Sequence, residues 1–204
     1  MSFEKILIFQ ASPAHTASTL LVNALYGMIE ELQDNHIFFD EPNQPTVILD
    51  YKLENEFADK NIMIVKTHNT NIDKLTTLYK DKYNLFFICS QRIKENLVIN
   101  RKYLDYKNVV VFHFAEINET PENTVSNIID TIYNRVYPLL SNYECIKLNK
   151  EGGIQRINDM NKTCEEIKEN PFSYVDSFYH LHGSHRNRDN NKKNEKMKKI
   201  KNEK

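Results

Sequence analysis

The stretch Lys5-Ile6-Leu7-Ile8-Phe9-Gln10, followed by Ala11-Ser12-Pro13-Ala14-His15-Thr16-Ala17 and a periodic segment from Ser18, decides the fold. Its first six residues form a short continuous apolar run, which is typical of a strand buried on both faces. Pro13 interrupts regular structure, so the next segment is predicted to be a loop. After Ser18, apolar residues recur with helical spacing at Leu21, Leu25, Met28, Ile29 and Leu32. The stretch therefore predicts a strand, a loop and a helix whose N-terminus can hold a phosphate group.

The rest of the chain repeats this alternation of strands and helices. Apolar runs predict further strands at residues 61–66, 85–89 and 108–114, and a short one at Thr46–Leu49. Helical spacing predicts helices at residues 53–60, 72–82, 91–106, 122–140 and 154–169. Strands that alternate with helices indicate an α/β fold, with a parallel sheet between two layers of helices.

Composition indicates one domain with a basic tail. The chain has 204 residues, of which 40% are hydrophobic, so it can bury a sizeable core. Residues 186–204 carry nine Lys/Arg and three Asp/Glu, whereas residues 1–185 carry 18 and 25. We therefore expect a single domain over residues 1–185 and a disordered tail over residues 186–204. The tail could contact a polyanion weakly, but nucleic acid binding is not expected, because no aromatic residues in it could stack on bases.

Cysteine usage and hydropathy point to a cytoplasmic protein. Cys89, Cys145 and Cys164 are odd in number and widely spaced, so they predict buried thiols in a reducing compartment rather than disulfides. No apolar run reaches the roughly 20 residues that span a bilayer, so no membrane association is expected. The spacing of His180, His182 and His185 could suit a metal, but no cysteine or clear carboxylate partner is nearby, and no metal is expected.

Polar residues follow three of the predicted strands where each one ends. They are Ser12–Thr19, Lys66-Thr67-His68 and Ser90-Gln91-Arg92. In parallel sheets ligands bind at the carboxyl ends of the strands, so these segments are expected to form one site. Their side chains are of the kind that a phosphate or sulfate site uses.

Three blocks of the chain resemble the sulfotransferase family, in the order that this family has them. Residues 14–21, Ala-His-Thr-Ala-Ser-Thr-Leu-Leu, resemble the family's 5′-phosphosulfate loop, roughly P-[RK]-S-G-[ST]-T-L-L. Residues 62–68, Ile-Met-Ile-Val-Lys-Thr-His, look like its apolar strand that ends in Lys-Thr-His. Residues 86–100 are similar to its 3′-phosphate segment, with Arg92 at the place of the Arg and Asn100 where the family has a Ser. The resemblance covers about half of the chain, and it implies the P-loop-like three-layer α/β architecture of that family.

The resemblance implies transfer of a sulfuryl group from 3′-phosphoadenosine-5′-phosphosulfate (PAPS), used as co-substrate, to an acceptor hydroxyl or amine. The backbone N–H groups of residues 16–19 (Thr16, Ala17, Ser18, Thr19) would hold the 5′-phosphate. Arg92 and Asn100 would hold the 3′-phosphate, and Arg186 would belong to a late cofactor loop. Lys66 would neutralise the sulfuryl group, and His68 would take the acceptor's proton.

The chain departs from this family's pattern at two positions of the loop. His15 stands where the family has the Lys or Arg that contacts the leaving group, so it is the third candidate catalytic residue. Ala17 stands where the family has Gly, and its Cβ is unfavourable if the loop needs a positive φ there.

Two other functions stay open. A non-catalytic nucleotide-binding or scaffold protein of the same fold would tolerate both departures. A nucleotide-type kinase of similar architecture would need a loop lysine and an acid that holds magnesium, and this loop has no lysine. The acceptor and the oligomeric state are not indicated by the sequence.

Overall fold

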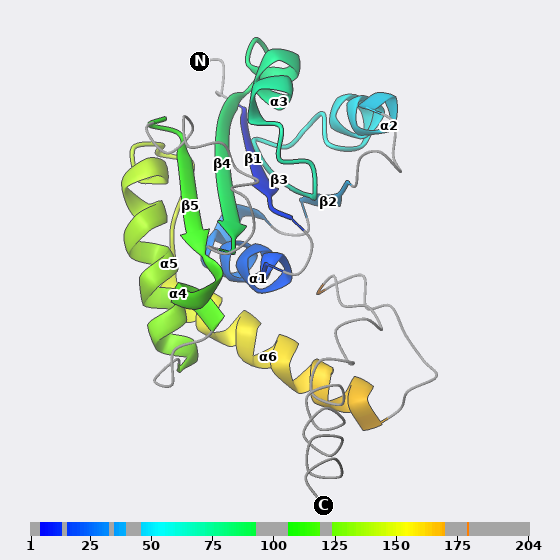
Figure 1. Ribbon diagram of the computed structural model, residues 1–204. Coiled ribbons are helices and arrows are strands. Elements are labelled where there is room, and N and C mark those ends of the chain that lie inside the picture. Colours follow the sequence, from blue (N-terminus) through cyan, green and yellow to red (C-terminus); the bar gives the residue numbers. More distant parts are fainter. Residues whose placement is uncertain are drawn as a thin grey trace, which may run out of the picture. The chain divides into compact units, whose positions relative to one another are not determined.

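A computed structural model describes residues 5–13, 16–32, 35–39, 46–92, 106–118, 124–169 and 179 of the chain. These residues divide between two compact units, Met1–Ile157 and Asn158–Lys204. The first unit contains a five-stranded sheet with the order β2-β3-β1-β4-β5, in which each pair of neighbours is parallel. The fold is therefore α/β with a parallel sheet flanked by helices, as the alternation of elements predicts (Figure 1).

The strands are β1 (Ile6–Ala11), β2 (His36–Phe38), β3 (Ile62–Thr67), β4 (Asn84–Gln91) and β5 (Val109–His113). Every residue of β1 and β3 is buried, as expected for central strands of a parallel sheet covered on both faces. Of the five, the edge strand β2 is not predicted from the sequence, because three residues without an apolar run give no periodic signal.

Helices cover both faces of this sheet. On one face lie α2 (Thr46–Tyr51), the short π-helical turn η2 (Lys52–Glu56) and α3 (Ile72–Tyr79). Residues from these elements share an apolar cluster with alternate residues of the strands, among them Phe9, Val65 and Phe87. On the opposite face lie α1 (Ser18–Met28) and α5 (Val125–Leu140), as Figure 1 shows. The three-layer arrangement gives the two faces of each strand different neighbours.

The remaining elements complete the description of the chain. A 3₁₀ turn, η1 (Glu30–Leu32), follows α1, and α4 (Phe114–Asn118) follows β5 directly. Helix α6 (Lys150–Glu169) begins in the first unit and continues into the second. Among the described residues, no helix combines the length and the apolar character needed to cross a membrane.

Several predicted elements differ from the structure. The apolar run Thr46–Leu49 predicts a strand, which is wrong, because Leu49 and Leu53 are buried four residues apart while Val47 is exposed, a helical pattern. The two ends of the predicted helix 91–106 are wrong, because Gln91 belongs to β4 and neither Arg92 nor Tyr106 is helical. Residues 93–105 of that prediction lie outside the described residues. Helix α1 ends at Met28, four residues before its apolar pattern does, because Ile29 forms an antiparallel bridge with Leu148.

Candidate functional site

Polar side chains gather at the carboxyl ends of β1, β3 and β4, on the face that α1 covers. Phe9, Val65 and Cys89 point into the apolar cluster on the α3 side of the sheet. Because side chains alternate along a strand, Gln10, Lys66 and Ser90 point to the α1 side. All three are at most 2% exposed, so polar groups replace the apolar core at this end of the sheet.

Three hydroxyl groups meet beneath the loop that joins β1 to α1. The Ser12 hydroxyl accepts a hydrogen bond from the Ser90 backbone N–H at 2.8 Å, and its Oγ lies 3.1 Å from Ser90 Oγ. Thr16 Oγ1 lies 3.2 Å from Ser90 Oγ and donates to the Pro13 carbonyl at 2.7 Å. Gln10 Nε2 donates to Ser12 Oγ at 2.5 Å. These bonds tie the loop to the ends of β1 and β4 and fix where α1 begins.

Lys66 is a buried cation at the start of α1. Its ammonium donates to Thr19 Oγ1 at 2.9 Å and lies 5.5 Å from the centre of the Phe38 ring. Within the part of the chain that the structure describes, no carboxylate forms an ion pair with it. Loss of hydration on burial lowers the pKa of Lys66 from 10.5 to about 8. An ammonium with one neutral acceptor and no counter-ion is a place where an anion would be stabilised.

The N-terminus of α1 adds to this positive field. Its N-cap residue, Ala17, makes no side-chain hydrogen bond to the helix, and no acidic residue lies in the first turn. The N–H groups of the first turn and the helix dipole favour an anion there. Ala17 has φ 65° and ψ 24°, and it is the one residue with positive φ among those that the structure describes. The loop thus takes the left-handed turn that glycine adopts most easily, with alanine in it.

His68 lies just beyond β3, at the same edge. Its Nδ1 is 2.8 Å from the carbonyl oxygen of Ser12, and its ring contacts the edge of Phe38 at 6.2 Å between ring centres. A carbonyl can only accept, so Nδ1 carries the proton and Nε2 keeps its lone pair in the neutral ring. This tautomer leaves Nε2 able to accept a proton from a bound group.

The predicted site residues divide into three groups. The structure brings together Thr16, which contacts Ser90, His68, which contacts the Ser12 carbonyl, and the bonded pair of Lys66 and Thr19. Ala17 and Ser18 lie at the helix start beside them. Arg92 lies at the same edge of the sheet, but its guanidinium carbon sits 4.2 Å from the Phe114 ring centre, toward β5. His15, Asn100 and Arg186 lie outside the described residues, as do His180, His182 and His185.

Two further contributors were not predicted from the sequence as site residues. Phe38, on the unpredicted strand β2, contacts both Lys66 and His68. Asn23 donates to the Thr19 carbonyl at 2.8 Å and accepts from Arg156 Nε at 3.1 Å, so α6 supports the first turn of α1. Arg156 is 133 residues from Asn23 in the chain, and no local pattern signals such a contact.

Comparisons with protein-family models, curated proteins and solved structures found no match to this chain. The chemistry of the site is therefore judged from its geometry. A buried lysine, an uncapped helix start and a set of hydroxyls can hold a tetrahedral oxyanion such as phosphate or sulfate. The His68 imidazole stands at the same edge, and its Nε2 can accept a proton when the ring is neutral.

Proposed function

We propose that the chain binds the phosphosulfate group of PAPS at the start of α1 and transfers its sulfuryl group to an acceptor hydroxyl or amine. The observation that carries this proposal is Lys66, a buried ammonium without a counter-ion in the described part of the chain, beside the N-terminus of α1, which has no side-chain cap. An anion placed there would gain charge-assisted hydrogen bonds and would offset the cost of burying the lysine.

The proposed reaction moves one sulfuryl group and one proton. The acceptor oxygen or nitrogen attacks the sulfur atom in line with the bond to the 5′-phosphate oxygen. That bond breaks and leaves adenosine 3′,5′-bisphosphate, while the acceptor's proton passes to Nε2 of His68. Lys66 stabilises the negative charge on the sulfuryl oxygens, and such preorganised positive groups supply much of the catalysis in transfers of this type.

Calorimetry with adenosine 3′,5′-bisphosphate tests the binding step. We expect the wild-type chain to bind this nucleotide, Lys66→Met to lose binding, and Arg92→Ala to weaken it. Lys80 is an exposed lysine at the end of α3, so Lys80→Met is the matched control and should bind as the wild type does. Absence of binding to the wild-type protein would overturn the proposal.

The transfer step has a sharper test at His68. In His68→Asn the new amide can still donate to the Ser12 carbonyl, as Nδ1 of the imidazole does, but it offers no base. Nucleotide binding should therefore be kept while sulfuryl transfer from PAPS to a panel of phenol, sugar and amine acceptors is lost. Equal turnover in His68→Asn and the wild type would refute the assignment of His68 as the base.

A binding protein without catalysis is the second candidate, and the buried hydroxyl cluster favours it. Ser12, Thr16 and Ser90 are fully buried and bonded to one another, so they are already satisfied without a ligand. This candidate predicts nucleotide binding that depends on Lys66, with no transfer to any acceptor and no effect of His68→Asn.

A further inference from the structure

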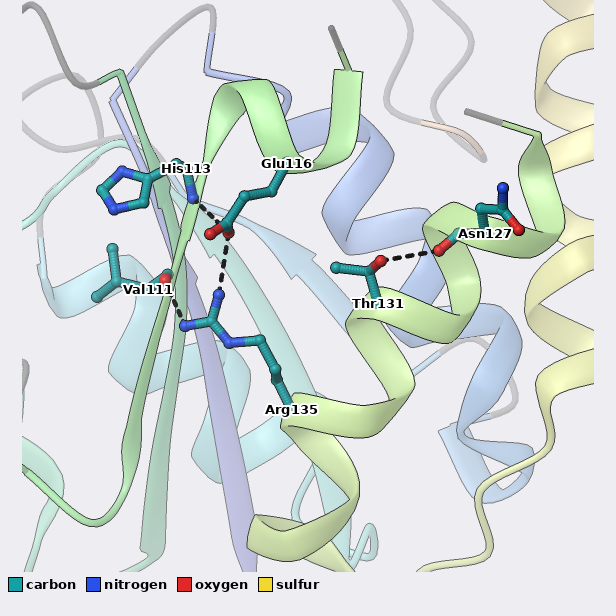
Figure 2. A network of polar contacts seen from close by, with 6 residues as sticks. All are labelled: Val111, His113, Glu116, Asn127, Thr131 and Arg135. Carbon is teal, nitrogen blue, oxygen red and sulfur yellow. Dashed lines mark hydrogen bonds and ion pairs between the residues drawn. The ribbon is translucent and has the colours of Figure 1, made fainter. Parts of the chain in front are cut away.

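Two polar side chains lie side by side at the ends of β4 and β5, on the other face of the sheet from Ser90. Gln91 and His113 are paired in the register of these strands. The preceding residues on the same face, Cys89 and Val111, belong to the apolar cluster on the α3 side. Figure 2 shows the His113 ring pointing away from α5, on the same side of β5 as Val111. Gln91 and His113 thus end the apolar face with an amide and an imidazole.

Both side chains have buried polar atoms without a partner. Gln91 is 2% exposed, and in the described part of the chain neither its Nε2 nor its Oε1 has a hydrogen-bond partner. His113 Nδ1 is buried and without a partner in the same residues, although the His113 residue as a whole is only half-buried. Buried polar groups in proteins are nearly always hydrogen-bonded, so two adjacent exceptions need an explanation. A bound group that supplies the missing hydrogen-bond partners is one such explanation.

The backbone beneath His113 is held firmly in place. Its N–H donates to Glu116 Oε2 at 3.0 Å, and the same oxygen accepts from Arg135 at 3.0 Å. Arg135 also donates to the Val111 carbonyl at 2.7 Å, as Figure 2 shows. The end of β5 is therefore tied to α4 and α5, so the imidazole is presented from a fixed position.

The surroundings of the pair favour an uncharged ligand. Val111 is apolar, and burial raises the pKa of the Cys89 thiol to about 12, which keeps it neutral. The Gln91 amide offers an acceptor and a donor side by side. That arrangement matches adenine, whose amino group donates beside a ring nitrogen that accepts, and glutamine pairs with adenine in this two-bond manner elsewhere. Guanine presents two acceptors on the corresponding edge and matches it less well.

We propose that Gln91, with His113 beside it, binds the adenine ring of the nucleotide whose phosphate groups bind at α1. This inference rests on the proposed function. Ser90 and Gln91 are consecutive, and they point to opposite faces at the same end of β4, so one ligand that passes over this edge could contact both. Gln91 Oε1 accepts from the adenine amino group, Nε2 donates to a ring nitrogen, and His113 Nδ1 supplies a third contact.

The test compares three probes by calorimetry: adenosine 5′-monophosphate, inosine 5′-monophosphate and inorganic phosphate. Inosine has a carbonyl in place of the amino group, so it removes the donor that Gln91 Oε1 would accept from. We expect the wild type to prefer the adenosine nucleotide to the inosine nucleotide by about tenfold or more. In Gln91→Met, which keeps the length of the side chain, this preference should disappear while phosphate affinity stays unchanged.

The outcomes separate this inference from the proposed function. Phosphate binding with an unchanged adenosine preference in Gln91→Met would overturn the adenine site and leave the anion site standing. The same holds if Gln91→Met loses thermal stability without changing the preference, because that loss would mean that the amide is already satisfied, for example by water. Failure of all three probes to bind the wild type would overturn both. His113→Phe provides a second variant, expected to weaken the adenosine nucleotide selectively, should Gln91→Met not fold.

Discussion

Replacement of Lys66 by methionine should stabilise the ligand-free protein while it abolishes anion binding. Methionine keeps an unbranched apolar stem of similar length, so the packing against Phe38 is largely retained. The change removes an ammonium whose one hydrogen-bond acceptor in the described residues is Thr19 Oγ1. A residue that serves only the fold would instead lower stability when it is replaced.

The magnitude follows from the pKa of Lys66. A lowering from 10.5 to about 8 corresponds to roughly 3 kcal/mol of unfavourable free energy for the charged form in the folded state. The Thr19 hydroxyl loses its donor in the variant, which offsets part of the gain by about 1 kcal/mol. We therefore expect Lys66→Met to be more stable than the wild type by about 1–3 kcal/mol at pH 7.

The pH dependence gives an independent signature. Below pH 8 Lys66 is charged in both the folded and the unfolded chain, so the full free-energy cost of burying its charge lowers the stability of the fold. Between pH 8 and 10.5 the unfolded chain binds a proton that the folded chain releases, so wild-type stability rises with pH. Lys66→Met lacks this rise, and its advantage over the wild type should shrink across that window.

Urea unfolding at pH 7 and pH 10, with and without millimolar sulfate, measures all of these effects. Sulfate should stabilise the wild type and Lys80→Met alike by specific binding, whereas Lys66→Met reports only the general effect of the salt. The reasoning is refuted if Lys66→Met is less stable than the wild type by the same amount at both pH values. It is equally refuted if sulfate stabilises Lys66→Met as much as it stabilises Lys80→Met.

Three further substitutions test the framework around the site. Ala17→Gly should stabilise the chain by up to about 1 kcal/mol, because glycine adopts a positive φ without strain, and an unfolding curve that shows a loss would contradict the strained loop. Gly152→Ala should destabilise it by about 1–3 kcal/mol, because the new Cβ would run into the Gly27 carbonyl. At the neighbouring Gly153 the nearest atom belongs to the flexible Met28 side chain, so Gly153→Ala should lower the stability less. Equal losses of stability in the two variants would argue against the close approach of α6 to α1 at Gly152.

The sequence predicts the parts of this protein that depend on local pattern. The buried strands and their alternation with helices are visible as apolar runs and helical spacing, and they place Thr16, Lys66 and His68 at one edge because parallel strands end together. Contacts that depend on register or on distant elements are not visible. The pairing of Gln91 with His113 needs the alignment of β4 and β5, and the support of Thr19 by Asn23 and Arg156 needs the packing of α6.

The features that lower the stability of this fold lie at the carboxyl edge of the sheet. Among the described residues, Lys66 is a buried charge without a counter-ion and Gln91 is a buried amide without a partner. Ala17 is a strained non-glycine residue. Each would be relieved by a simple substitution, to methionine or glycine, without a change of fold. When a well-packed protein has several destabilising residues at one place, that place is usually where a ligand binds. Because the three residues come from different elements and meet at one edge, a shared ligand explains them more simply than three separate defects.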